Sequence, residues 1–585
     1  MRYPQLKELP TTRQMVDVFK GYNHNLRIGD GEFFDMKNMT SDYYPVLSPR
    51  GKRGFYVKPA SPQGLIAKDA ICYVDGPNFV MGEYIIDMGL STAAKDCPKQ
   101  LVSMGAYVII MPDKKYINTM DITDFGDIEA SFTTTTDVSF ELCTINGDVY
   151  SNTVISPAEP SNPANLDYWI DTSTTPNTLK QYSATSGMWV AIATTYIKIS
   201  AAGIGAAFNQ YDGVTISGIV KPDLQDLNGT MVLWDKGDDY IVVLGILGAV
   251  TSQTVAEGAI KVERRMPNID FLIESENRLW GCRYGTALNG DVVNEIYACK
   301  LGDFRNWNCF MSLSTDSYVA SCGTDGQFTG AITHLGYPLF FKENCVHKVY
   351  GNYPANFQIQ TTACRGVQKG CHNSLAIVNE TLFYKARTGI CAFDGSLPTE
   401  ASYAMGNEAY GDAVGGAHGN KYYVSMKDLN DVWHLFVYDT AKGMWHKEDN
   451  LHASAFCSCR SELYCIDADH MNIITMFGSG EEDAEEVPWM VETGEWGISS
   501  PDMKYISRIT VRMSMAVGAK ADFYAQYDMS DEWIHICTIR GTNLRSFSIP
   551  IRPRRCDHMK LRIEGEGMAK IYSFTKTIEQ GSELS

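Results

Sequence analysis

Short runs of alternating apolar and polar side chains, separated by turns rich in Gly, Asp and Asn, make up most of this chain. Ile509–Met515 and Met559–Glu564 alternate cleanly, and Ala106–Ile110 is a shorter, mostly apolar run. Alternation with a period of two indicates strands that bury one face and expose the other. No long segment keeps the i, i+3, i+4, i+7 spacing of an amphipathic helix. The pattern therefore predicts an all-β chain in which helix is a minor component.

Four segments in the second half of the chain repeat one pattern: a short aromatic strand, a turn, a second aromatic strand, then Asp, Gly or Trp. They begin at Leu339, Leu382, Tyr422 and Leu463, so that their spacings are 43, 40 and 41 residues. A period near 40 residues of short strands is typical of β-propeller blades.

Weaker copies of the same pattern precede these four and begin at Ala70, Ala106 and Arg278. Together the copies predict a β-propeller of about seven blades. The alternative interpretation is a string of unrelated hairpins, which the nearly equal spacing of the last four copies disfavours.

Two interruptions divide the candidate blades from the rest of the chain. Thr133–Thr136 and the Pro-rich Ser156–Pro163 lie near the start of a long insertion, which a propeller tolerates because loop-closure entropy grows slowly with length. The acidic run Glu481–Glu486 predicts a solvated linker. The predicted organisation is an entry segment with the first blades (1–126), an inserted β module or modules (127–263), the remaining blades (264–480) and a C-terminal β-sandwich with a tail (487–585).

The charge balance limits the partners of the chain. It has 50 Lys and Arg against 69 Asp and Glu, a formal net charge of -19. Such a surface disfavours tight, sequence-independent binding of duplex DNA, although it does not exclude a wall past which DNA slides. The basic clusters are small, and we interpret them as contacts to a partner chain, with DNA phosphate as the alternative. Their residues are Arg50, Lys52, Arg53, Arg264, Arg265, Arg552, Arg554 and Arg555.

No motif in the chain predicts catalysis, a metal or a cofactor. It contains no G-x-S-x-G, Walker A, H-E-x-x-H or C-x-x-C pattern, and Thr324–Thr329 lacks the spacing of the Asp-box turns of sialidases. A glycosidase needs two carboxylates about 5 to 10 Å apart, and the sequence nominates no such pair. We therefore predict a protein that is not an enzyme, with free thiols and no bound metal.

Aromatic residues of the insertion offer a second candidate chemistry. Trp169 and Trp189 would stack against the rings of a host surface glycan if they were exposed. The alternative, which we favour, is that both form the core of a small module.

Several stretches, taken in their order along the chain, resemble phage tail nozzle proteins, also called packaged-DNA stabilisation proteins. They are Tyr44–Gly51, Phe341–Asn344, Asn379–Tyr384 and the C-terminal stretch from Arg554–His558 onward. Tyr168–Ser173, within the insertion, is similar to a short module common in phage tail proteins. The large insertion departs from the compact pattern of the family.

The resemblance implies a structural virion protein that assembles in the host cytoplasm. Members of the family form a ring, usually of six copies, below the portal and adaptor, and this ring is the distal channel that retains the genome and later lets it pass. The expected partners are therefore a homohexamer, the portal, adaptor and other tail proteins, and double-stranded DNA in transit. The alternative function is a receptor-binding tail protein that recognises a host glycan through the inserted module.

Overall fold

The computed structural model describes residues 11–92, 99–151, 153–247, 251–287, 290–478, 481–482 and 486–580. Within these ranges the chain is nearly all β, with four short 3-10 helices and no α-helix, so the predicted fold class is confirmed at this level. No helix of the described part has the length and apolar character needed to cross a membrane.

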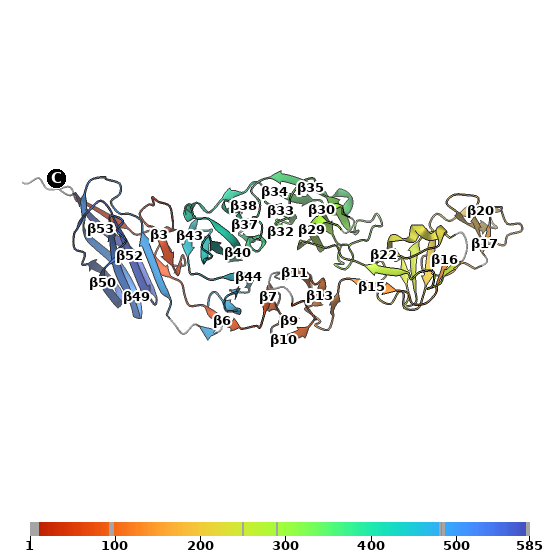
Figure 1. Ribbon diagram of the computed structural model, residues 1–585, viewed down its shortest axis with the longest axis horizontal. Coiled ribbons are helices and arrows are strands. Elements are labelled where there is room, and N and C mark those ends of the chain that lie inside the picture. Colours follow the sequence, from red (N-terminus) through yellow and green to blue (C-terminus); the bar gives the residue numbers. More distant parts are fainter. Residues whose placement is uncertain are drawn as a thin grey trace, which may run out of the picture. The chain divides into compact units, whose positions relative to one another are not determined.

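The chain divides into two compact units. The first comprises residues 1–98, 340–346 and 361–585, and the second comprises 99–339 and 347–360. Four-stranded antiparallel sheets, in which consecutive strands are neighbours, occur in both units (Figure 1).

Two such sheets belong to the first unit, and two further groups of four consecutively paired strands belong to larger sheets. The group from Tyr410 to Lys447 is the end of a 13-stranded sheet, and the group from Ala453 to Thr475, with Gly54–Val57, is part of a five-stranded sheet. Buried side chains join neighbouring sheets: Tyr423 and Leu435 pack with Leu463, and Tyr73 packs with Ile466. The strands are β7 (Pro62–Ala67), β8 (Ile71–Asp75), β9 (Asn78–Met81) and β10 (Tyr84–Asp87); β36 (Ala376–Val378), β37 (Thr381–Ala386), β38 (Gly389–Phe393) and β39 (Thr399–Glu400); β40 (Tyr410–His418), β41 (Lys421–Asp428), β42 (Trp433–Asp439) and β43 (Met444–Lys447); β44 (Ala453–Cys459), β45 (Glu462–Asp467) and β46 (Asn472–Thr475) with β6 (Gly54–Val57).

The strand β6 comes from the N-terminal part of the chain and completes a sheet made of residues 453–475. It pairs antiparallel with β46, Gly54 lying opposite Thr475. The same strand also pairs with β47 (Glu481–Glu482), which belongs to the acidic run predicted to be a linker. Residues 483–485 of that run lie outside the described residues.

The second unit contains two further sheets of the same kind, and a third is cut by the division between the units. Val102 and Ile109 pack with Leu272 and Leu279 in one core, which joins the first two sheets. The strands are β11 (Gln100–Met104), β12 (Tyr107–Met111), β13 (Lys115–Asn118) and β14 (Phe125–Asp127); β28 (Phe271–Ser275), β29 (Arg278–Thr286), β30 (Val292–Ala298) and β31 (Tyr318–Ser321); and, in the third sheet, β32 (Gly330–His334), β33 (Tyr337–Lys342), β34 (Cys345–Tyr350) and β35 (Gln358–Ala363).

The sequence repeat corresponds to one position in these sheets. Leu339, Leu382, Tyr422 and Leu463, the starting points of the four copies, all lie in the second strand of a sheet. Nearly every residue of these strands is buried, because each is covered on both faces. A strand covered on both faces reads as a continuous apolar run rather than as an alternation, which explains why this strand carried the signal.

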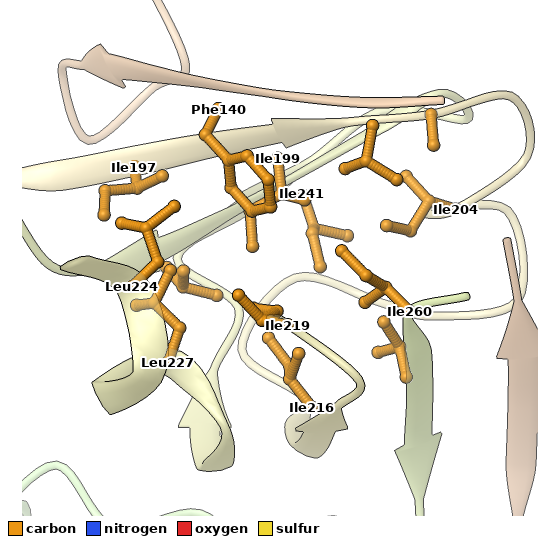
Figure 2. Packing of buried hydrophobic residues seen from close by; sticks show 14 of the residues in the cluster. Phe140, Ile197, Ile199, Ile204, Ile216, Ile219, Leu224, Leu227, Ile241 and Ile260 are labelled. Atoms are coloured by element: carbon orange, nitrogen blue, oxygen red, sulfur yellow. The ribbon is translucent and has the colours of Figure 1, made fainter. Parts of the chain in front are cut away.

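The insertion lies within the second unit, and it begins and ends at two adjacent strands. Ala130 of β15 (Ala130–Thr133) lies opposite Arg264 of β27 (Lys261–Arg264), close to the predicted limits of 127 and 263. Two sheets share one core, in which Phe140 and Ile241 point toward Ile219 and Ile260 (Figure 2). Their other strands are β16 (Val138–Cys143), β21 (Tyr196–Ser200), β22 (Gly213–Ser217), β23 (Gly229–Val232), β24 (Asp235–Lys236), β25 (Tyr240–Leu244) and β26 (Thr251–Gln253), with the 3-10 helix η1 (Pro222–Leu227).

A small four-stranded sheet follows β16 in the chain. Its first two strands are parallel and the others antiparallel. They are β17 (Thr153–Ser156), β18 (Tyr168–Asp171), β19 (Thr178–Ser183) and β20 (Met188–Ala191).

The C-terminal residues form a sheet around one long strand, β49 (Lys504–Tyr527). On one side it pairs with β50 (Ile534–Ile549); on the other it pairs with β53 (Ala569–Gln580) along its first half and with β52 (Met559–Glu566) along its second.

This sheet also takes strands from the start of the chain, which differs from the predicted organisation. β1 (Thr11–Val16) pairs with β53, and β3 (Glu32–Lys37) pairs with β48 (Pro488–Thr493). Residues 11–37 therefore belong with the C-terminal module rather than with the first blades. Antiparallel pairing between strands so far apart in sequence leaves no local pattern from which to predict it.

Candidate functional site

The cluster Arg50–Arg53 lies between the strands β5 (Ser48–Pro49) and β6. It contacts two carboxylates of the loop that follows β43. The guanidinium of Arg53 donates to Glu448 at 2.8 Å and to Asp449 at 2.7 Å. Arg50 reaches the same pair, at 3.2 Å from Asp449 and 3.4 Å from Glu448. We call Arg50, Arg53, Glu448 and Asp449 the arginine clamp.

Electrostatics keeps the clamp charged although it is buried. Burial alone would lower the pKa of Arg53, but the charges of Asp449 and Glu448 raise it above its ordinary value. Burial would raise the pKa of Asp449, and the two arginines hold it below its ordinary value. The predicted role of Arg50 and Arg53 as contacts to DNA or a partner chain is therefore wrong, because their partners lie in the same chain.

Three other basic residues of the predicted clusters are also paired within the chain. Lys52 is half-buried and lies 3.5 Å from Glu486. Arg264 is buried and donates to Asp212 at 2.6 Å, an acid that also accepts from Asn306. Arg265 is exposed and pairs with Glu263. The buried pair of Arg264 contradicts its predicted external contact, whereas for the exposed Arg265 that contact stays a prediction.

Arg552, Arg554 and Arg555 behave differently. All three are exposed, and none forms an ion pair with any residue that the structure describes. The guanidinium of Arg554 lies 5.6 Å from the centre of the Tyr527 ring. Among the predicted basic residues, this group keeps its charge available to an external partner.

Two arginines that the sequence reasoning missed extend this group. Arg540 and Arg545 lie on β50, are exposed, and likewise form no ion pair within the described ranges. Each stands alone in the sequence, so that a search for adjacent basic residues passes over them. The available signal was a stretch, Trp533–Cys556, that contains five arginines and no acid. We call Arg540, Arg545, Arg552, Arg554 and Arg555 the arginine edge.

Trp169 and Trp189 of the insertion pack against each other in the small sheet. Trp169 is 5% exposed, its indole N–H donates to the carbonyl of Ser156, and the ammonium of Lys180 lies 4.5 Å above its ring. Trp189 is half-buried and packs edge-on against Trp169, with the ring centres 5.6 Å apart. The interpretation of Trp169 as a sugar-stacking residue is wrong, because neither ring face is open.

A charged pair supports this packing from one side. Lys180 also donates to Asp171 at 2.8 Å, and its hydrogen bond together with that from Ser173 lowers the pKa of Asp171 to about 2. The cation above Trp169 is therefore held in place by a carboxylate that stays ionised.

The described residues contain no group of three or more His, Cys, Asp or Glu side chains placed to hold a metal ion. The described cysteines are free thiols.

No model of a protein family matches the chain, and no curated protein matches it. Among solved structures it is similar to exo-β-1,3-galactanase from Phanerochaete chrysosporium, with 8% identity and a TM-score of 0.21 over 52% of this chain and 94% of that one. It is similar to Trypanosoma rangeli sialidase, with 7% identity and a TM-score of 0.23 over 99% and 97%. PorZ, a surface component of the type-IX secretion system of Porphyromonas gingivalis, has 11% identity and a TM-score of 0.25 over 88% and 77%.

These matches correct one prediction. Because the galactanase and the sialidase are enzymes, they contradict the prediction that this chain is not one, and the exclusion of an enzyme is withdrawn. With TM-scores of 0.25 or less they carry no activity, substrate or catalytic residue over to this chain.

Proposed function

We propose that this chain is a structural protein of a phage tail, and that it forms the distal nozzle channel through which packaged DNA is retained and later released. The observation that carries the proposal is the succession of groups of four consecutively paired antiparallel strands, the last of which is completed by the N-terminal strand β6.

We interpret the groups of four consecutively paired antiparallel strands in each unit as propeller blades. Within the first unit the first strands of successive sheets contact one another, β36 with β40, β40 with β44 and β44 with β7. Within the second unit β11 contacts β28, which contacts β32. Contacts between the first strands of successive sheets are typical of blades around a common axis, where only short strand edges remain open.

A propeller suits a channel component because it is a stiff disc. Closure of the last sheet by β6 ties the N-terminal part of the chain to residues 453–475, so the disc does not open without loss of that pairing. Cyclic association of identical discs closes a tube. The net charge of -19 favours a wall to which phosphate does not adhere.

The partners proposed with this function are a homohexameric ring, the portal and adaptor, other tail proteins and double-stranded DNA in transit. The location is the tail of the virion, after assembly in the host cytoplasm. The resemblance of Tyr44–Gly51 and the other quoted stretches to tail nozzle proteins supports this assignment.

Negative-stain images of the purified full chain, combined with its mass from light scattering, test the proposal. We expect rings with a central hole wide enough for a DNA duplex. A stable monomer, or an oligomer that has no central hole, would contradict the nozzle.

A further inference from the structure

β50 presents a long open edge of the C-terminal sheet. It pairs with β49 on one side and with no described strand on the other. Of its residues only Ile549 is buried, whereas those of β49 mostly alternate between buried and half-buried. In an edge strand every second residue points its N–H and C=O away from the sheet, and these groups are a template for another strand.

The apolar face of β49 continues onto β50 without a complete cover. Ile539 lies opposite Ala521 and Phe547 lies opposite Val511, so each pair shares one face of the sheet. Ala521 and Val511 are fully buried, but their partners on β50 are only half-buried, and Ile534 on the same strand is 40% exposed. A strand with apolar side chains on one face and an open backbone edge fits a second protein surface better than it fits a nucleic acid.

The charge of this region is opposite to that of the chain. The arginine edge contributes five positive charges, and no acid occurs from Trp533 to Cys556, although the whole chain carries 69 Asp and Glu against 50 Lys and Arg. Arginine is enriched at protein interfaces, where its planar group binds carboxylates in pairs.

We propose that the edge of β50, with the arginine edge around it, docks onto an acidic face of a second copy of this chain. The inference rests on the proposed function, because it supplies the contact by which copies of the chain assemble. The surplus of acid lies outside Trp533–Cys556, so another copy offers the complementary charge.

The same charges determine the geometry of the contact. Two β50 edges placed face to face would bring Arg540 and Arg545 of both copies together, and like charges on paired strands repel. The contact therefore joins β50 of one copy to a different surface of the next. Such head-to-tail contacts build closed rings or open filaments rather than two-fold dimers.

The test compares two charge-reversal variants of the full chain. In the edge variant Arg540→Glu, Arg545→Glu and Arg555→Glu are combined. The control variant combines Arg27→Glu, Lys58→Glu and Arg387→Glu, three exposed residues that form no ion pair with a described residue and give the same change in net charge. Mass is measured by light scattering over a range of protein concentrations, at low and high salt, and binding of a labelled DNA duplex is measured in parallel.

We expect the wild-type chain and the control variant to assemble and the edge variant to dissociate. The association constant of the edge variant should be at least ~100-fold lower than that of the wild-type chain. High salt should also lower the association constant of the wild-type chain, because it screens the charges of the contact. Equal masses for all three proteins, dissociation of both variants, or a monomeric wild-type chain would each overturn the inference. So would loss of DNA binding in the edge variant without a change in mass, which would assign the arginines to nucleic acid.

Images of the same samples separate this inference from the proposed function. Wild-type rings with a hole that persist in the edge variant would leave the nozzle standing and remove β50 as the contact. Assemblies without a hole that depend on the arginine edge would keep the contact and remove the nozzle.

Discussion

The arginine clamp and the arginine edge belong to the same unit and contain nearly the same short motifs, yet the structure uses them in opposite ways. Arg53 is buried and meets Glu448, an acid 395 residues away along the chain. Arg555 is exposed and has no acid partner among the described residues. The comparison teaches that the partner, rather than the basic motif, decides whether such a cluster is internal structure or a surface for another molecule.

The largest difference should appear when each arginine is truncated. Arg53→Ala removes the closer of the two cations that pair with Glu448 and Asp449 and leaves Arg50 alone with both carboxylates, which costs about 3 kcal/mol of stability. Urea unfolding, followed by Trp fluorescence, measures the loss. Arg555→Ala is the matched variant, and a loss of the same size at both positions would remove the distinction between the two clusters.

Trp169 extends the contrast between buried and exposed sites to the inserted module. Trp169→Ala should destabilise the small sheet by about 3–5 kcal/mol, because the side chain is buried and holds the edge of Trp189. Limited proteolysis within residues 153–191 reports the loss. If Trp169→Ala left the module resistant to proteolysis and abolished binding to a glycan array, Trp169 would be a binding residue after all.

A buried histidine of the first unit should make the stability of the chain sensitive to acid. Burial lowers the pKa of His446, on β43, from 6.5 to about 3. Between these two values only the unfolded chain takes up the proton, so stability is complete above pH 6.5 and falls as the pH decreases, by about 1.4 kcal/mol per pH unit. Urea midpoints from pH 7 to pH 4 measure the slope.

A His446→Gln variant provides the control for this slope, because glutamine does not titrate. Its stability should depend less on pH over the same range. A slope identical to that of the wild-type chain would show that other groups cause the acid sensitivity.

The smallest effect is expected at the arginine edge. Arg552→Ala removes an exposed side chain with no ion pair in the described part of the chain, so the free energy of unfolding should change by less than about 0.5 kcal/mol. Thermal unfolding at low protein concentration is the suitable measurement. A loss of 2 kcal/mol or more would place Arg552 in the internal structure, as Arg53 is.

Sequence reasoning succeeded where the signal was local. The repeat beginning at Leu339, Leu382, Tyr422 and Leu463 was visible because each second strand is covered on both faces, and the inserted module was visible from its Pro-rich and Thr-rich margins. Both signals come from residues within one strand or loop.

It failed where the deciding partner lies far away in the sequence. Nothing near Arg53 indicates Glu448, and nothing near β1 indicates that it pairs with β53 at the other end of the chain. Arg540 and Arg545 were missed for a different reason. They are not adjacent in sequence, and they belong to one group because both lie on β50.

The most direct test of the account is hydrogen exchange of the β50 amides as a function of protein concentration, with β41 as the internal reference. The central residues of β41, Tyr422–Met426, are buried and the strand is paired on both sides, so their exchange should be slow at every concentration. The account predicts that those amides of residues 534–549 that point away from β49 exchange rapidly in dilute wild-type chain and become protected as copies assemble. Exchange of these amides that stays equally fast in the assembled and the dilute protein would contradict it.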